Sequence, residues 1–309
     1  MMRTPMNAVI CSVFLILFSF LVFLSEAAPV YNSHYCTDSI TYKQNSTFRA
    51  NLNLLLSSLS SMASLGNSFY RTRSGSDTPD VVNGLFLCRG DISGAACSDC
   101  VATAAKEILR RCHVEKEAII WYDVCMLRYS NQNLNNIVPG VDLTDNKSIA
   151  RSELDRFNEL LAGMLNSLAT KAANSQDEKF ATGEVNLTST ETLYGLVQCM
   201  PDLTFFECNM CFRSAIAFIP NCCDGKQGAR VLLPACNIRY ELYPFYNTAV
   251  ATAPPPIQAR SSGRSRVSVI LAFVIPIGGS VLLFALGLCS FFGRQATSTI
   301  KSLKENEFF

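Results

Sequence analysis

The chain contains fourteen cysteines, and their regular spacing suggests metal binding, thiol redox chemistry or disulfide bonds. Ten of them form two identical patterns, C-x8-C-x2-C-x11-C-x12-C, and each cysteine of the second pattern lies 111 positions after its counterpart. They are Cys88, Cys97, Cys100, Cys112 and Cys125, then Cys199, Cys208, Cys211, Cys223 and Cys236. A C-x2-C pair suits zinc ligation or thiol redox chemistry in a reducing compartment, and disulfide bonds in an oxidising one. The compartment therefore decides which chemistry to expect.

The first 27 residues have the pattern of a secretory signal peptide. Arg3 precedes an uncharged run, Met6–Ser25, with an apolar middle, and small residues at Ala27 and Ala28 offer a cleavage site. The alternative is an uncleaved anchor helix. A signal peptide places residues 28–266 outside the cell, where disulfides form and persist.

A second apolar segment, Val267–Phe292, contains no charged residue and is long enough to cross a bilayer. It predicts one transmembrane helix, preceded by a Pro/Ser/Arg-rich stalk over 249–266 and followed by a short cytoplasmic tail over 293–309. Sequons for N-glycosylation at Asn45, Asn146 and Asn186 fall in the part expected outside. We therefore expect a single-pass protein of the plasma membrane.

In this compartment the repeated cysteines favour structural disulfides over a metal site. Only two histidines exist, and neither lies near the second C-x2-C pair. We expect no metal and no cofactor. The low net charge, +1, gives no nucleic-acid footprint. Cys222 and Cys223 are adjacent, and the residues leave open whether they pair with each other or stay free.

The offset of 111 is shared by other residues and shows an internal duplication. We expect one domain over 28–136 (repeat one) and another over 137–248 (repeat two). Each repeat begins with a helical pattern, continues with a strand that ends at a cysteine, adds a second helix after C-x2-C, and closes with two strands. The prediction is an α+β fold: two tandem disulfide-linked domains, each with two helices packed on a small antiparallel sheet, plus the transmembrane helix.

The repeated C-x8-C-x2-C, with Cys125-Met-Leu-Arg-Tyr129 in repeat one and the run from Gly228 to Tyr246 in repeat two, resembles the plant ginkbilobin-type, or stress-antifungal, domain. Tandem copies with a signal peptide and one span resemble cysteine-rich receptor-like kinases and plasmodesmata-located proteins. The resemblance implies the pairs Cys36–Cys112, Cys88–Cys97, Cys100–Cys125, Cys199–Cys208 and Cys211–Cys236. Repeat two departs from the pattern, because it has no counterpart of Cys36: the position 111 residues later is Lys147.

The resemblance also implies a mannose site made of an Asn, an Arg and a Glu. At the matching places repeat one has Thr37, Ile119 and Ser130, none of which fits. Repeat two keeps Arg230 and Glu241, and Asn146 supplies the Asn when the phenylalanines of the first helices are aligned with a small gap. The competing interpretation is a cross-strand ion pair between Arg230 and Glu241.

No catalytic motif is found. The 17 residues after the predicted span are too few for a kinase domain, and G-x-G-x-x-G, G-x-S-x-G and H-E-x-x-H are absent. We expect a non-enzymatic, membrane-anchored ectodomain that binds a cell-wall carbohydrate or the ectodomain of the same or a related receptor, in plant stress and defence signalling or at cell-to-cell junctions. The alternative is a truncated receptor-like serine/threonine kinase.

Overall fold

The computed structural model describes residues 28–37, 40–75, 80–134, 139–176 and 178–247. The predicted signal peptide, stalk, transmembrane helix and tail lie outside these residues, so their assignments stay predictions. Among the described helices, none combines the length and the apolar character needed to cross a bilayer. Both repeats are covered, and they belong to one compact unit, residues 28–254.

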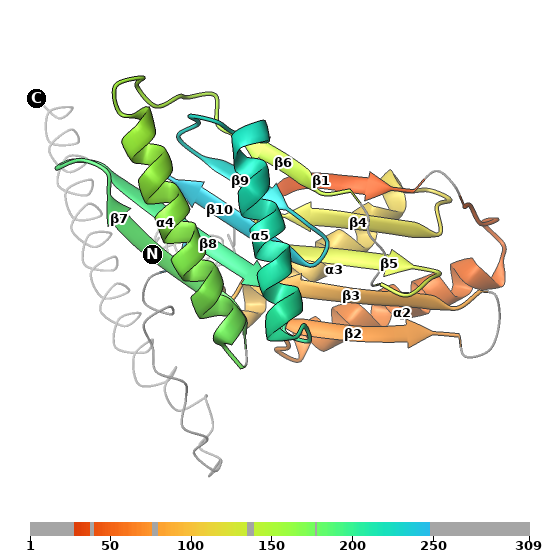
Figure 1. Cartoon of the computed structure of the whole chain (residues 1–309). Helices are drawn as coiled ribbons and strands as arrows, with labels where there is room; N and C mark the ends of the chain where they lie inside the picture. The colour runs from red at the N-terminus through yellow and green to blue at the C-terminus, as the bar shows by residue number, and fades with distance from the viewer. Residues whose placement is uncertain (1–27, 38–39, 76–79, 135–138, 177, 248–309) are drawn as a thin grey trace, which may run out of the picture. The chain divides into compact units, whose positions relative to one another are not determined.

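Each repeat folds into a five-stranded antiparallel sheet with two helices on one face (Figure 1). Repeat one contains β1 (Tyr31–Cys36), α2 (Thr47–Ser64), β2 (Phe69–Ser74), β3 (Val82–Cys88), α3 (Gly94–Arg111), β4 (Glu117–Tyr122) and β5 (Cys125–Ser130). Repeat two contains β6 (Val141–Thr144), α4 (Leu154–Asn174), β7 (Phe180–Asn186), β8 (Thr192–Cys199), α5 (Phe205–Cys222), β9 (Ala229–Leu232) and β10 (Cys236–Glu241). The expected helices-on-sheet architecture is correct.

The two sheets have the same strand order. It is β1-β4-β5-β3-β2 in repeat one and β6-β9-β10-β8-β7 in repeat two. The sequence predicted the three inner strands of each sheet and missed the two outer ones. The outer strand β2 is half-buried at nearly every position and shows no apolar periodicity, whereas β6 alternates but has only four residues, too few to be recognised as a strand.

The core of each repeat lies between its helices and its sheet. In repeat one, Phe48, Leu52 and Leu59 of α2 pack with Phe86 and Leu127 of the sheet, and all five are fully buried. Repeat two has the equivalent cluster around α4, α5 and the inner strands. Side chains alternate across a strand, so the residues between these core positions point to the opposite face of the sheet.

Those opposite faces meet in a third cluster that joins the repeats. It combines Leu85, Leu87, Ile119, Trp121, Met126 and Leu134 of repeat one with Met200 and Leu232 of repeat two. Polar contacts also cross the junction: Gln198 Nε2 donates to the carbonyl of Cys88 at 3.0 Å, and Arg71 lies 2.9 Å from Asp202. The repeats therefore share a buried interface.

Candidate functional site

The five cysteine pairs implied by the family resemblance are the pairs present. They are Cys36–Cys112, Cys88–Cys97, Cys100–Cys125, Cys199–Cys208 and Cys211–Cys236. In both repeats, one bond joins the end of the third strand in chain order to the second helix, and another joins that helix to the last strand. The C-x2-C cysteines thus serve to hold helix and sheet together.

Repeat two differs in its sixth bond, which joins the neighbours Cys222 and Cys223. Cys223 is the counterpart of Cys112, but it has no first-strand cysteine to reach. Two groups of side chains have metal-like spacing: Cys36 and Cys112 with Glu115, and Cys222 and Cys223 with Asp142. In both groups the two sulfur atoms are bonded to each other, so neither group offers thiolate ligands in this state.

A buried arginine on the last strand of each repeat is neutralised by a carboxylate, but from different strands. In repeat one, Arg128 of β5 donates to Glu117 of β4 at 2.7 Å. In repeat two, Arg239 of β10 donates to Glu241 of the same strand at 2.8 Å. The position of Glu117 in repeat one is occupied by Gly228 in repeat two. The position of Glu241 in repeat two is occupied by Ser130 in repeat one. The carboxylate has moved from one strand to the next while the buried charge pair is retained.

This exchange corrects one interpretation of the sequence. Glu241 pairs with Arg239 and not across the strands with Arg230, because Arg239 lies directly opposite Arg230 in the sheet register. Glycine at position 228 suits the new arrangement, since a Cβ there would overlap the Glu241 carboxylate unless that side chain shifted. Gly228 and Glu241 both border an open space beside β9.

That space is a polar pocket with a volume of about 240 Å³. Its wall comes from β6 and the residue after it, from β9 and β10, and from β1 of repeat one. The residues that line it are Asn32, Leu143, Thr144, Asp145, Gly228, Ala229, Arg230, Glu241 and Tyr243. We refer to this set as the polar pocket.

Arg230 is the half-buried cation of the polar pocket. Its guanidinium donates to Asn32 Oδ1 of repeat one at 3.0 Å, and within the described part of the chain it forms no ion pair. Burial, followed by the neighbouring charge of Arg239, lowers the pKa of Arg230 from its ordinary value, while Glu241 and Asp123 oppose this shift. Arg230 thus retains donors that no carboxylate of the described residues occupies.

The structure brings together only part of the site expected from the sequence. Arg230 and Glu241 line the same pocket, whereas Asn146 is exposed and does not line it. The neighbouring Thr144 and Asp145 do. Sequence reasoning missed Asp145, Tyr243 and Asn32. Asn32 had no signal, because it reaches the pocket across the junction between the repeats.

The three predicted glycosylation sites are sterically accessible. Asn45 and Asn146 lie in connections that precede α2 and α4, and Asn186 is the last residue of β7. All three side chains are exposed. Since Asn146 lies next to Asp145 in the chain, a glycan there would sit near the rim of the polar pocket.

A family model described as "Salt stress response/antifungal" matches residues 35–132 and 144–243, once in each repeat. The chain belongs to this family. It is 48% identical over 235 residues to cysteine-rich receptor-like protein kinase 25 of Arabidopsis thaliana, covering 74% of this chain and 35% of that protein. It is 41% identical over 323 residues to cysteine-rich receptor-like protein kinase 8 of the same plant, covering 98% and 47%. The chain thus spans less than half the length of these relatives.

A solved structure has the same fold. The tandem DUF26 ectodomain of the Arabidopsis thaliana cysteine-rich receptor-like protein PDLP8 matches with a TM-score of 0.58 at 23% identity, covering 70% of this chain and 99% of that one. Together with the kinases, it supports a receptor-like extracellular part. The resemblance read from the cysteine pattern is confirmed.

Proposed function

We propose that this member of the salt stress response/antifungal family is a non-enzymatic, single-pass membrane protein whose extracellular repeats bind a carbohydrate in the polar pocket. The observation that carries the proposal is Arg230, a half-buried guanidinium with a neutral partner, Asn32, and no ion pair among the described residues. Such a group leaves donors for a ligand that supplies acceptors.

The chemistry of the pocket matches a polyol. Arg230 offers N–H donors, Asp145 and Glu241 offer carboxylate acceptors, and Thr144 and Tyr243 carry hydroxyls that do both. A sugar ring presents hydroxyl groups that donate and accept in turn, so mixed donors and acceptors around one small pocket suit it. Because Glu241 is paired with Arg239, the charges of Arg230 and Asp145 are left to balance each other. This balance favours a neutral hexose such as mannose over a charged ligand.

The site belongs to repeat two together with one residue of repeat one. At the equivalent place, repeat one has Glu117 and Ile119 where repeat two has Gly228 and Arg230, so repeat one lacks the cation on which the proposal depends. We infer that repeat one supports the site and repeat two carries it. The receptor-like relatives support a membrane protein with the repeats outside the cell, and we place it at the plasma membrane or at plasmodesmata.

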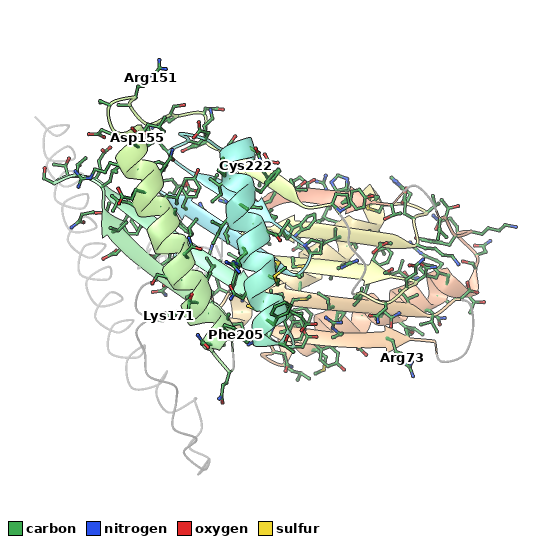
Figure 2. All side chains as sticks on the ribbon, viewed as in Figure 1. Arg73, Arg151, Asp155, Lys171, Phe205 and Cys222 are labelled. Atoms are coloured by element: carbon green, nitrogen blue, oxygen red, sulfur yellow. A yellow bond between two sulfur atoms is a disulfide. The ribbon has the colours of Figure 1, made fainter. Side chains whose placement is uncertain are left out.

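Titration calorimetry of the purified full chain with D-mannose tests the proposal. The wild type should show saturable binding, and Arg230→Ala should weaken it at least about tenfold, because hydrogen bonds to a charged group contribute about 1.5–3 kcal/mol. Arg151→Ala is the matched control, since Arg151 is exposed near the start of α4 (Figure 2). Absent binding in the wild type, or equal binding by Arg230→Ala, contradicts a sugar site here.

A second candidate follows from the relatives that this chain matches over less than half of their length. In that case the repeats are the extracellular part of a receptor-like kinase. Immunoblotting of native tissue with an antibody against the repeats separates the two. A glycosylated product near 34.0 kDa supports the anchored ectodomain, and a product of about twice that mass supports the kinase.

A further inference from the structure

We propose that two copies of this chain associate through the outward face of α5, helix against antiparallel helix, around a two-fold axis at Met210. This surface is separate from the polar pocket, which lies at the sheet and not on the helices. In Figure 1, α4 and α5 lie side by side over one face of the second sheet, and Figure 2 labels Phe205 and Cys222 at the two ends of α5.

The outward face of α5 is unusually apolar for a solvent-exposed helix. Phe206 is 70% exposed, Met210 is 48% exposed and Phe218 is 43% exposed. The turn spacing of an α-helix places Phe206, Met210 and Ala217 within one stripe, with Phe218 beside it. A helix facing only water carries polar residues there, so a stripe of this kind indicates a contact surface.

The duplicated helix α3 has charged residues on the same face. At the positions of Met210, Ala217 and Phe218, it carries Asp99, Lys106 and Glu107. Glu107 forms ion pairs with Arg110 and Arg111 along the helix. The fold therefore accepts charges at these positions, and their absence from α5 is not required by the packing of the core.

The order of residues along α5 makes this face complementary to itself. At 100° per residue, Phe206 and Arg213 lie on one flank of Met210, and Glu207 and Ser214 lie on the other. A two-fold axis at Met210 reverses the helix direction and keeps each flank against the same flank of the second copy. Phe206 then faces Arg213 of the second copy, and Glu207 faces Ser214 of the second copy.

These pairings give each charged group on the face a suitable partner. Arg213 is exposed and makes no ion pair or hydrogen bond among the described residues, so its guanidinium is available to an aromatic ring. Glu207 uses one carboxylate oxygen, Oε2, to cap the helix at Thr204. Its other oxygen is left for the Ser214 hydroxyl. Met210 meets Met210 at the axis, where the same arrangement of α3 would place Asp99 against Asp99.

The same axis identifies the occupant as a second copy of this chain. A partner with another sequence would need to supply its own cation opposite Phe206 and its own acceptor or donor opposite Glu207. One helix stripe is smaller than a standard interface of about 1,600 Å². We therefore expect weak association that becomes populated when copies are concentrated in one membrane.

Co-precipitation of two differently tagged full-length chains, coexpressed in plant cells, tests the proposal. The wild-type chains should precipitate together, and Met210→Asp in both should reduce recovery at least fivefold because it brings two carboxylates to the axis. Met210→Lys in both should do the same. Mixing Met210→Asp on one tag with Met210→Lys on the other should restore recovery, since opposite charges then meet.

Asp99→Lys on α3 is the matched control and should leave recovery unchanged. Delivery of each variant to the cell surface and its electrophoretic mobility under non-reducing conditions show that it has folded. Recovery that Met210→Asp leaves at the wild-type level, a wild type that does not self-precipitate, or a mixed pair that is not restored overturns the two-fold α5 contact.

Discussion

Repeat one and repeat two have the same fold and the same strand order, yet residues at equivalent positions have different roles. Repeat one ties its first strand to its second helix through Cys36–Cys112 and places apolar residues on the sheet face at the junction. Repeat two lacks that bond and carries Gln198, Arg230 and Asn237 on the equivalent face, where repeat one has Leu87, Ile119 and Met126. Under the proposed function, this difference means that duplication left one repeat to stabilise the molecule and freed the other to bind a ligand.

The largest expected effect concerns the two disulfides that the repeats do not share, Cys36–Cys112 and Cys222–Cys223. Cys36–Cys112 spans 76 residues, and loop-closure entropy gives it about 4.5 kcal/mol of stabilisation. The double variant Cys36→Ser with Cys112→Ser should lose most of this free energy of unfolding. The double variant Cys222→Ser with Cys223→Ser should lose little, because its bond closes no loop between distant segments. Thermal unfolding of the full chain measures both, and equal losses would remove the distinction.

The exchanged carboxylate is the next test. Glu241→Gln leaves Arg239 buried without a counter-charge among the described residues, which costs about 3–5 kcal/mol. Gly228→Glu alone should also destabilise, because the added side chain collides with Glu241. Gly228→Glu combined with Glu241→Ser restores the arrangement of repeat one.

Denaturant unfolding should therefore place that double variant within about 1 kcal/mol of the wild type, as expected when partners in one network are changed together. A double variant no more stable than Gly228→Glu alone would mean that the two repeats do not solve the same charge problem.

A smaller effect concerns pH and belongs to repeat one. Burial, followed by the charge of Arg111, lowers the pKa of His34 below 6.5, so the unfolded chain binds its proton more readily than the folded chain. The free energy of unfolding therefore has its full value, as far as His34 is concerned, above pH 6.5 and decreases as the pH falls below that value. Melting temperatures at pH 7.5 and 5.5 should differ less in His34→Gln than in the wild type. An identical pH dependence would exclude His34 as the cause.

Much of this architecture could be predicted from the cysteines. Their offset revealed the duplication, and their family resemblance implied the five shared pairs. The outer strands escaped because strands such as β2 are half-exposed and carry Arg71 and Arg73 among their residues. The polar pocket was found only in part. Arg230 and Glu241 follow from the motif, but Asn32 enters across a junction that no local pattern encodes.

Asn146 is a residue that the sequence placed at the site and the structure does not. Alignment placed it at the site, and the structure leaves it exposed one residue beyond the lining. Glu241 lines the polar pocket, but its ion-pair partner is Arg239 and not Arg230. The register that sets Arg230 opposite Arg239 depends on strand pairing, and a single strand's sequence does not determine it.

The most direct test of the central claim replaces Arg230 by the residue that repeat one has at that position, Ile119. Titration calorimetry of full-length Arg230→Ile with D-mannose should show at least about a tenfold loss of affinity, worth about 1.4 kcal/mol. Its melting temperature should stay close to that of the wild type, because Arg230 makes no ion pair among the described residues. Unchanged affinity for mannose in Arg230→Ile would contradict the claim that recognition resides in the polar pocket of repeat two.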